Sequence, residues 1–157
     1  LRFLGAVEDA RIAPLVDALA LVAAAARPFV LPVTGTGAFP SFRQPRVLWV
    51  GVVSPALVAL AAAVDAACAN AGWPAEARPF HPHVSLGRVR ERRRRSTSTR
   101  TEERADAAAL AARVATAGDG LRVHAAVEEL VLFQSILDPR GARHHALARL
   151  PLGAPRG

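Results

Sequence analysis

The chain has 157 residues, a length that suits one domain with a core large enough to fold without disulfide bridges or a structural metal. Hydrophobic residues make up 52% of the sequence, which excludes a chain that is disordered throughout, and the single cysteine, Cys68, excludes a disulfide framework or a thiolate zinc cluster. All 20 basic residues are arginines against 13 acidic residues, and the net charge of +7 favours an anionic partner.

The front of the chain predicts the end of a strand followed by a helix. Residues 1–4 alternate weakly between apolar and polar side chains and stop at Gly5, and no methionine opens the chain, so we expect the protein to begin before Leu1. Residues 9–26 carry apolar side chains at helical spacing, with acidic residues at the end that the helix dipole favours. The apolar positions of this helix are Ile12, Leu15, Val16, Leu19 and Val22.

The central part predicts two strands and a second helix. Residues 29–33 form a short β-rich run, and residues 47–53 form a nearly continuous β-branched run typical of a strand buried on both faces. Ser54 and Pro55 then supply a cap and a first-turn proline for a helix that ends near Gly72. The longest apolar runs are shorter than a bilayer span, and a lone cysteine fits a reducing compartment, so we expect a soluble cytoplasmic protein.

The second half of the chain continues the alternation of strands and helices. Its predicted segments are a strand at 82–89, a polar surface loop at 90–101, a helix at 102–117, and strands at 121–133 and 145–150 separated by a turn. The whole order is β-α-β-β-α-β-α-β-β, an α+β pattern with two similar halves.

The most informative segment is residues 80–88, which read Phe-His-Pro-His-Val-Ser-Leu-Gly-Arg. In an extended strand His83 and Ser85 point to the same face, and Val84 and Leu86 point to the core behind them. A His-x-Ser pattern by itself is typical of a hydrogen-bonded strand histidine. An imidazole can also exchange a proton, and a serine hydroxyl can bind an anionic oxygen, so the pair indicates half of a phosphate-handling site.

Arg88 closes this segment but needs an irregularity to join the pair. Strict alternation turns its side chain away from His83. Its use at a phosphate therefore requires the strand to end or bulge near Gly87.

In its context the segment resembles the second signature of the two-histidine (2H) phosphoesterases, and it is most similar to the RNA 2',3'-cyclic phosphodiesterase family, also called 2'-5' RNA ligase-like. That signature is His-x-Thr/Ser followed by a hydrophobic residue, preceded by Phe-x-Pro and trailed by an arginine. Other stretches agree with the family in the same order, namely residues 1–5, 37–40 with 45–51, 132–135, and 148–152. The resemblance covers nearly the whole chain.

The resemblance implies one domain over residues 1–157 with a two-lobed α+β fold, in which two pseudo-symmetric antiparallel sheets surround a central cleft and the helices lie outside. It implies hydrolysis of RNA 2',3'-cyclic phosphate ends to 2'-phosphates, with reversible 2'-5' RNA ligation as a further activity. His83 would be the base, Ser85 would hold a non-bridging oxygen, and Arg88 would offset charge on the phosphoryl group. The expected partner is RNA with a cyclic phosphate end; we expect no metal, no cofactor, no obligate protein partner and a monomer.

One departure from the family pattern qualifies this reading. The family has a His-x-Thr/Ser motif in each half, whereas this sequence starts just after the position of the first motif. We therefore expect an N-terminally truncated chain that lacks the first catalytic histidine and has impaired turnover. The alternatives are a non-catalytic RNA-binding module and a related 2H enzyme that acts on a small cyclic nucleotide or an ADP-ribose cyclic phosphate.

The other histidines and the arginine-rich loop are open to two readings each. His81 is either an exposed edge residue or a substrate contact, and His124 either packs or faces solvent. His144 and His145 lack the carboxylate or thiol companions of a zinc or iron site. The loop at Arg92 to Arg95 is either a solvated segment or an RNA-gripping one.

Overall fold

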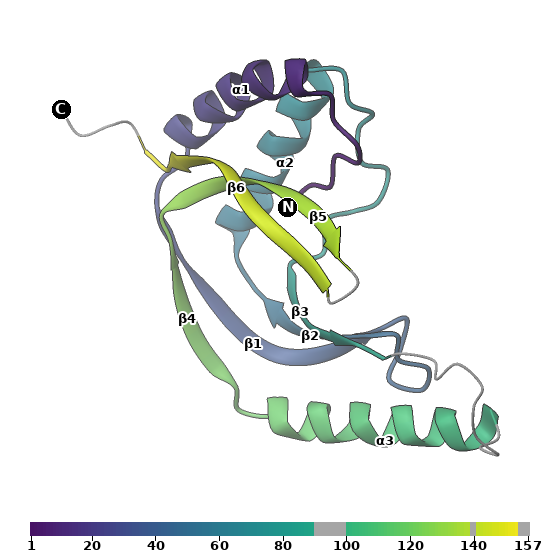
Figure 1. Ribbon diagram of the computed structural model, residues 1–157. Helices are drawn as coiled ribbons and strands as arrows, with labels where there is room; N and C mark the ends of the chain where they lie inside the picture. The colour runs from purple at the N-terminus through teal and green to yellow at the C-terminus, as the bar shows by residue number, and fades with distance from the viewer. Residues whose placement is uncertain (90–99, 139–140, 154–157) are drawn as a thin grey trace. The chain divides into compact units, whose positions relative to one another are not determined.

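The computed structural model describes residues 1–89, 100–138 and 141–153, except for the side chains of residues 100–104 (Figure 1). After a short 3-10 helix at Asp9–Arg11, its elements are α1 (Ile12–Ala25), β1 (Phe29–Phe39), β2 (Val47–Val52), α2 (Pro55–Asn70), β3 (His83–Arg88), α3 (Arg100–Gly118), β4 (Arg122–Val127), β5 (Glu129–Asp138) and β6 (Gly141–Pro151). The predicted α+β class with antiparallel sheets is confirmed.

The chain divides into two compact units, each built from segments far apart in sequence. Unit 1 comprises Leu1–Val30, Pro55–Phe80 and Ala126–Gly157, and unit 2 comprises Leu31–Ser54 and His81–Ala125. The predicted two-lobed cleft and the single-domain assignment stay predictions.

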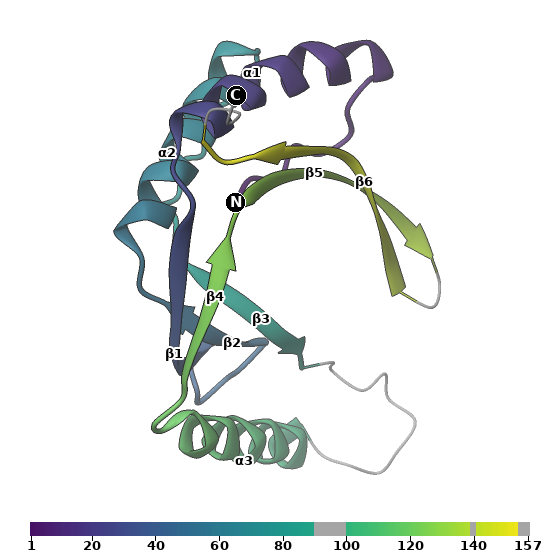
Figure 2. The ribbon, with the colours of Figure 1, turned by 90° about the vertical axis from the view of Figure 1, so that its left-hand side faces the viewer.

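Unit 1 packs α1 and α2 side by side against the two-stranded sheet of β5 and β6 (Figure 2). The buried positions recur at every fourth residue, which places them on one stripe of each helix. Burying each leucine in such a core contributes about 1.5–3 kcal/mol. The core residues are Leu15, Leu19 and Ala23 on α1, Leu60, Val64 and Cys68 on α2, with Trp73, Leu130 and Leu152.

Unit 2 contains most of a four-stranded sheet with the order β3-β2-β1-β4. β1 pairs with β2 antiparallel, and a bulge interrupts the register between Thr34 and Thr36. Gly35 lies in this bulge with φ of 66°, a conformation that glycine adopts without strain. The bulge explains why β1 continues as one strand through the glycines that interrupt the β-rich run in the sequence.

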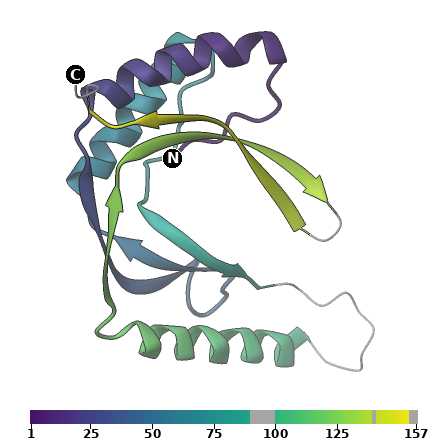
Figure 3. The ribbon, with the colours of Figure 1, turned by 60° about the vertical axis from the view of Figure 1, so that its left-hand side comes forward.

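α3 covers one face of this sheet at β1 and β2 (Figure 3). Ala111 of α3 is fully buried against Ala38 and Leu48, and the hydroxyl of Thr36 donates a hydrogen bond to the backbone oxygen of Val114. The opposite face of β1 and β2 therefore carries the side chains that α3 leaves uncovered.

Two sequence predictions about the elements were wrong. Residues 1–4 form no strand; instead Arg2 pairs with Asp65 of α2 and donates to the backbone oxygen of Pro74, so side-chain contacts hold this segment in place of a ladder. The run at 121–133 is two strands, because Glu128 separates β4 from β5. Among the helices that the structure describes, none is long and apolar enough to cross a bilayer.

Candidate functional site

The pairing of β3 with β2 decides which side chains share a sheet face. Residues directly opposite each other in an antiparallel pair point to the same face, and alternate residues of a regular strand do so too. Three alternate residues of β2 lie directly opposite the three predicted site residues on β3. The pairs are Gly51 with His83, Trp49 with Ser85, and Val47 with Arg88.

All three predicted site residues therefore lie on one face of the sheet, which we call the His83 face. The pairing places His83 and Ser85 two residues apart in an unbroken stretch, as period-two alternation predicts. All three side chains are exposed on β3.

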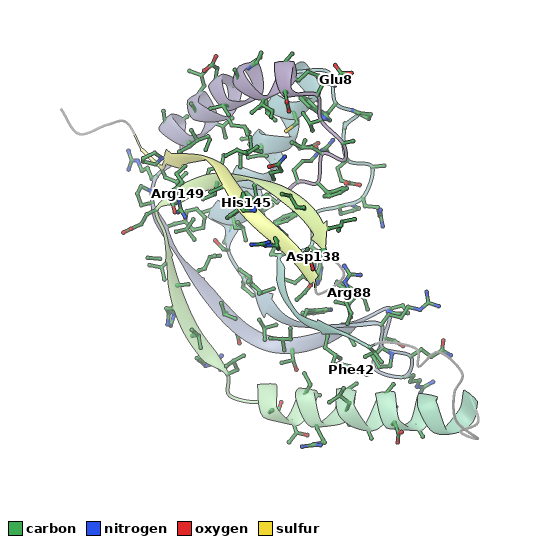
Figure 4. All side chains as sticks on the ribbon, viewed as in Figure 1. Glu8, Phe42, Arg88, Asp138, His145 and Arg149 are labelled. Carbon is green, nitrogen blue, oxygen red and sulfur yellow. The ribbon has the colours of Figure 1, made fainter. Side chains whose placement is uncertain are left out.

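Arg88 reaches the His83 face because of a bulge. The register shifts between Leu48 and Trp49, so that β3 holds one extra residue, Leu86, between Ser85 and Gly87. An extra residue reverses the alternation beyond it. This is the irregularity that the sequence required near Gly87, and Figure 4 shows Arg88 at the end of β3.

The predicted burial of Val84 and Leu86 was wrong. Their side chains are 52% and 57% exposed. β3 is an edge strand, and the buried cluster on the opposite face lies over β1 and β2, centred on Leu48. The apolar side chains of β3 are thus placed beyond that cluster.

The backbone fixes the protonation pattern of the His83 imidazole. Its Nδ1 lies 2.6 Å from the backbone oxygen of His81. A carbonyl oxygen can only accept, so Nδ1–H is the donor, and in the neutral ring Nε2 carries a free lone pair. The geometry leaves Nε2 as the nitrogen that can take a proton.

The rings of Phe39, Trp49 and His81 form an aromatic cluster beside this imidazole, and sequence reasoning missed it. The ring of Phe39 meets His83 edge-on at 5.1 Å between centroids and His81 at 5.5 Å. The indole of Trp49 lies 5.2 Å from His81 and 6.1 Å from His83. These contacts join three strands or their ends, so no local pattern in the sequence could have revealed them.

A second cation lies on the same face and was also missed. Arg122 of β4 donates a hydrogen bond to the hydroxyl of Thr34 at 3.2 Å, and Thr34 is paired with Gly51, the partner of His83. The guanidinium of Arg122 therefore reaches a residue of the His83 face.

The remaining histidines lie elsewhere. His124 is exposed on β4. In unit 1 the hydroxyl of Ser135 and the Nδ1 of His144 are 2.9 Å apart, and Phe133 meets this imidazole edge-on at 6.3 Å. His145 and Arg149 follow on β6 (Figure 4), with Arg149 paired to Glu129. Arg92 to Arg95 lie outside the described residues.

No group of three or more His, Cys, Asp or Glu side chains suited to a metal ion occurs among the side chains that the structure describes. The predicted independence from a metal stays a prediction.

Comparison with curated proteins finds relatives that share one name. The RNA 2',3'-cyclic phosphodiesterase of Geobacillus stearothermophilus is 42% identical over 89 residues, which are 56% of this chain and 28% of that protein. The protein of the same name from Aeropyrum pernix is 36% identical over 92 residues, 57% of this chain and 51% of that protein. The matched part spans about half or less of the length of these relatives.

Solved structures share the fold over nearly the whole chain. The crystal structure of TT0787 of Thermus thermophilus matches 98% of this chain and 76% of its own, with a TM-score of 0.72 at 21% identity. The Escherichia coli LigT structure complexed with 3'-AMP matches 96% of this chain and 74% of its own, with a TM-score of 0.62 at 25% identity.

A family model finally covers most of the sequence. The model described as the 2'-5' RNA ligase superfamily matches residues 3–136. This range includes the Val-Leu-Trp-Val-Gly run of β2 and the His-x-Ser strand β3. The chain therefore belongs to the 2'-5' RNA ligase superfamily.

Proposed function

We propose that the protein is an RNA 2',3'-cyclic phosphodiesterase that opens a cyclic phosphate end to a 2'-phosphate. Reversible 2'-5' RNA ligation is a further activity, in which a 5'-hydroxyl attacks the cyclic phosphate in place of water. The observation that carries this proposal is the common face of His83, Ser85 and Arg88, which the bulge at Leu86 creates. An imidazole, a hydroxyl and a guanidinium on one exposed face provide a base and two anion-binding groups.

The reaction assigns one step to each group. Nε2 of His83 accepts a proton from water as the water oxygen bonds to phosphorus, and the bond from phosphorus to the 3'-oxygen breaks. Ser85 donates a hydrogen bond to a non-bridging oxygen, and Arg88 offsets the charge that gathers on the phosphoryl group. The 3'-oxygen takes a proton from a second acid, which the family resemblance assigns to the histidine of a first His-x-Thr motif.

The names of the relatives support this choice of substrate. The curated relatives are named RNA 2',3'-cyclic phosphodiesterases, and a solved relative was crystallised with 3'-AMP. The net charge of +7 suits an RNA substrate.

Product analysis tests the proposal. We expect the full-length protein to convert a dinucleotide 2',3'-cyclic phosphate into the 2'-phosphate alone, identified by 31P NMR. Turnover of ADP-ribose cyclic phosphate with none of the dinucleotide would favour the small-substrate 2H enzyme. Salt-dependent RNA binding without turnover of either would favour the non-catalytic module.

A further inference from the structure

The indole of Trp49 occupies the space that a side chain at position 37 would need. A Cβ added to Gly37 would lie inside the indole ring, closer than van der Waals contact allows. Gly37 is buried and lies directly opposite Trp49 in the β1–β2 pair. Because its backbone conformation is open to any residue, the indole alone makes glycine necessary here.

The indole of Trp49 contacts His81, and His81 in turn contacts the candidate base His83. Trp49 and Phe39 both meet the His81 ring edge-on, at 5.2 and 5.5 Å between centroids and at 75° and 72°. The backbone oxygen of the same residue accepts the Nδ1–H of His83. The two rings thus hold the residue whose carbonyl selects the tautomer of His83.

Stability alone does not explain a tryptophan at this position. Its indole Nε1–H is buried and finds no hydrogen-bond partner among the described residues. A buried donor without a partner destabilises the folded state. A phenylalanine would keep an aromatic ring here without that cost.

We propose that Trp49, seated over Gly37, is a positioning residue that holds His81 and thereby keeps His83 in the Nδ1–H tautomer, with Nε2 free to act as the base. This inference rests on the proposed function of His83, and it concerns how the base is prepared. Phe39 adds the second ring contact to His81.

Four variants separate positioning from packing. Gly37→Ala displaces the indole, and Trp49→Phe removes the orphan N–H while retaining a smaller ring. The double variant Gly37→Ala/Trp49→Phe restores the space that alanine needs. Gly87→Ala is the matched control. Gly87 lies on the same strand as His83, and a Cβ added there would meet nothing within 4 Å.

The first readout is the tautomer of His83, measured by 15N NMR of the imidazole nitrogens, which does not depend on turnover. We expect Nδ1–H in the native protein and in Gly87→Ala, a mixture of tautomers in Gly37→Ala, and partial recovery in the double variant. Trp49→Phe should shift the tautomer toward a mixture while its melting temperature changes by no more than about 3 °C. An unchanged tautomer in both Gly37→Ala and Trp49→Phe overturns the inference.

The second readout is turnover of a dinucleotide 2',3'-cyclic phosphate by the full-length protein. We expect kcat of Gly37→Ala to fall about tenfold or more, up to the 10²–10⁴-fold that a positioned base contributes, with KM changed by no more than about twofold. A shifted tautomer with unchanged kcat would keep the link from Trp49 to His83 and contradict the assignment of His83 as the base. If Gly37→Ala does not fold, Trp49→Phe alone decides both readouts.

Discussion

Arg88 lies directly opposite Val47 across the β2–β3 pair, and this pairing sets its guanidinium on the same sheet face as His83. Without the extra residue Leu86 the side chain would have pointed to the α3 side of the sheet. The bulge therefore unites a base and a cation that strict alternation would have separated.

Replacing Arg88 tests this arrangement. Arg88→Ala should lower kcat on a dinucleotide cyclic phosphate about a hundredfold, because its contact strengthens as charge builds on the phosphoryl group. Arg88→Lys should recover only part of the loss, since lysine lacks the planar fork that binds two oxygens. Steady-state kinetics at two salt concentrations measure the effect, and an Arg88→Ala enzyme with native kcat would remove Arg88 from the site.

The arginines at positions 92–95 should behave differently. Replacing Arg92 to Arg95 together should weaken binding of a tRNA-sized substrate. The slope of log K against log salt concentration should fall by about one for each phosphate that these arginines no longer neutralise. Turnover of the dinucleotide should stay near the native value. Equal losses on both substrates at both salt concentrations would show that Arg88 and the arginines at positions 92–95 do not divide their roles in this way.

Ser85 should contribute through one hydrogen bond to a charged oxygen. Ser85→Ala should lower kcat/KM by the equivalent of roughly 1.5–3 kcal/mol. Ser85→Thr keeps the hydroxyl and should stay close to the native rate. If the alanine and threonine variants lose the same amount, the hydroxyl is not the group that matters.

The sequence predicted those features of the fold and site that depend on local periodicity. The spacing of Leu15 and Leu19 marks the buried stripe of α1, and the period of two places His83 and Ser85 on one face. It missed what depends on pairing between distant segments. Phe39 and Trp49 meet the histidines only because β1, β2 and β3 are neighbours, and the exposure of Val84 follows from the edge position of β3.

The thiol of Cys68, the single cysteine, should be unreactive in the folded protein. Burial is the main cause that raises the pKa of Cys68; nearby Asp65 raises it further and Arg2 opposes both. Cys68 is 1% exposed in the unit 1 core, so alkylation by iodoacetamide at pH 7 should be slow and should accelerate on unfolding in urea. Since the neutral thiol is favoured in the fold, the stabilising contribution of Cys68 is present below the ordinary thiol pKa. This contribution is lost as the pH rises through the raised pKa. Fast iodoacetamide labelling of the native protein, measured by mass spectrometry, would contradict the predicted slow alkylation.

The predicted impairment of residues 1–157 can be measured directly. The polypeptide of these residues should turn over a dinucleotide cyclic phosphate at least about a hundredfold more slowly than one that carries a first His-x-Thr motif before Leu1, because the family resemblance assigns one of the two proton-transfer groups to that motif. The longer chain should also have the higher melting temperature. Equal rates for the two polypeptides would mean that residues 1–157 supply both groups.

The most direct test of the proposed function is turnover by His83→Ala in the full-length protein. The matched control is His145→Ala, which removes one exposed imidazole from unit 1. His83 is exposed, so its removal should leave the melting temperature within about 3 °C of the native value, with binding of the 2'-phosphate product retained. We expect kcat of His83→Ala to fall at least about a hundredfold, whereas His145→Ala should keep the native rate. A His83→Ala protein that keeps most of its turnover would contradict the assignment of His83 as the base.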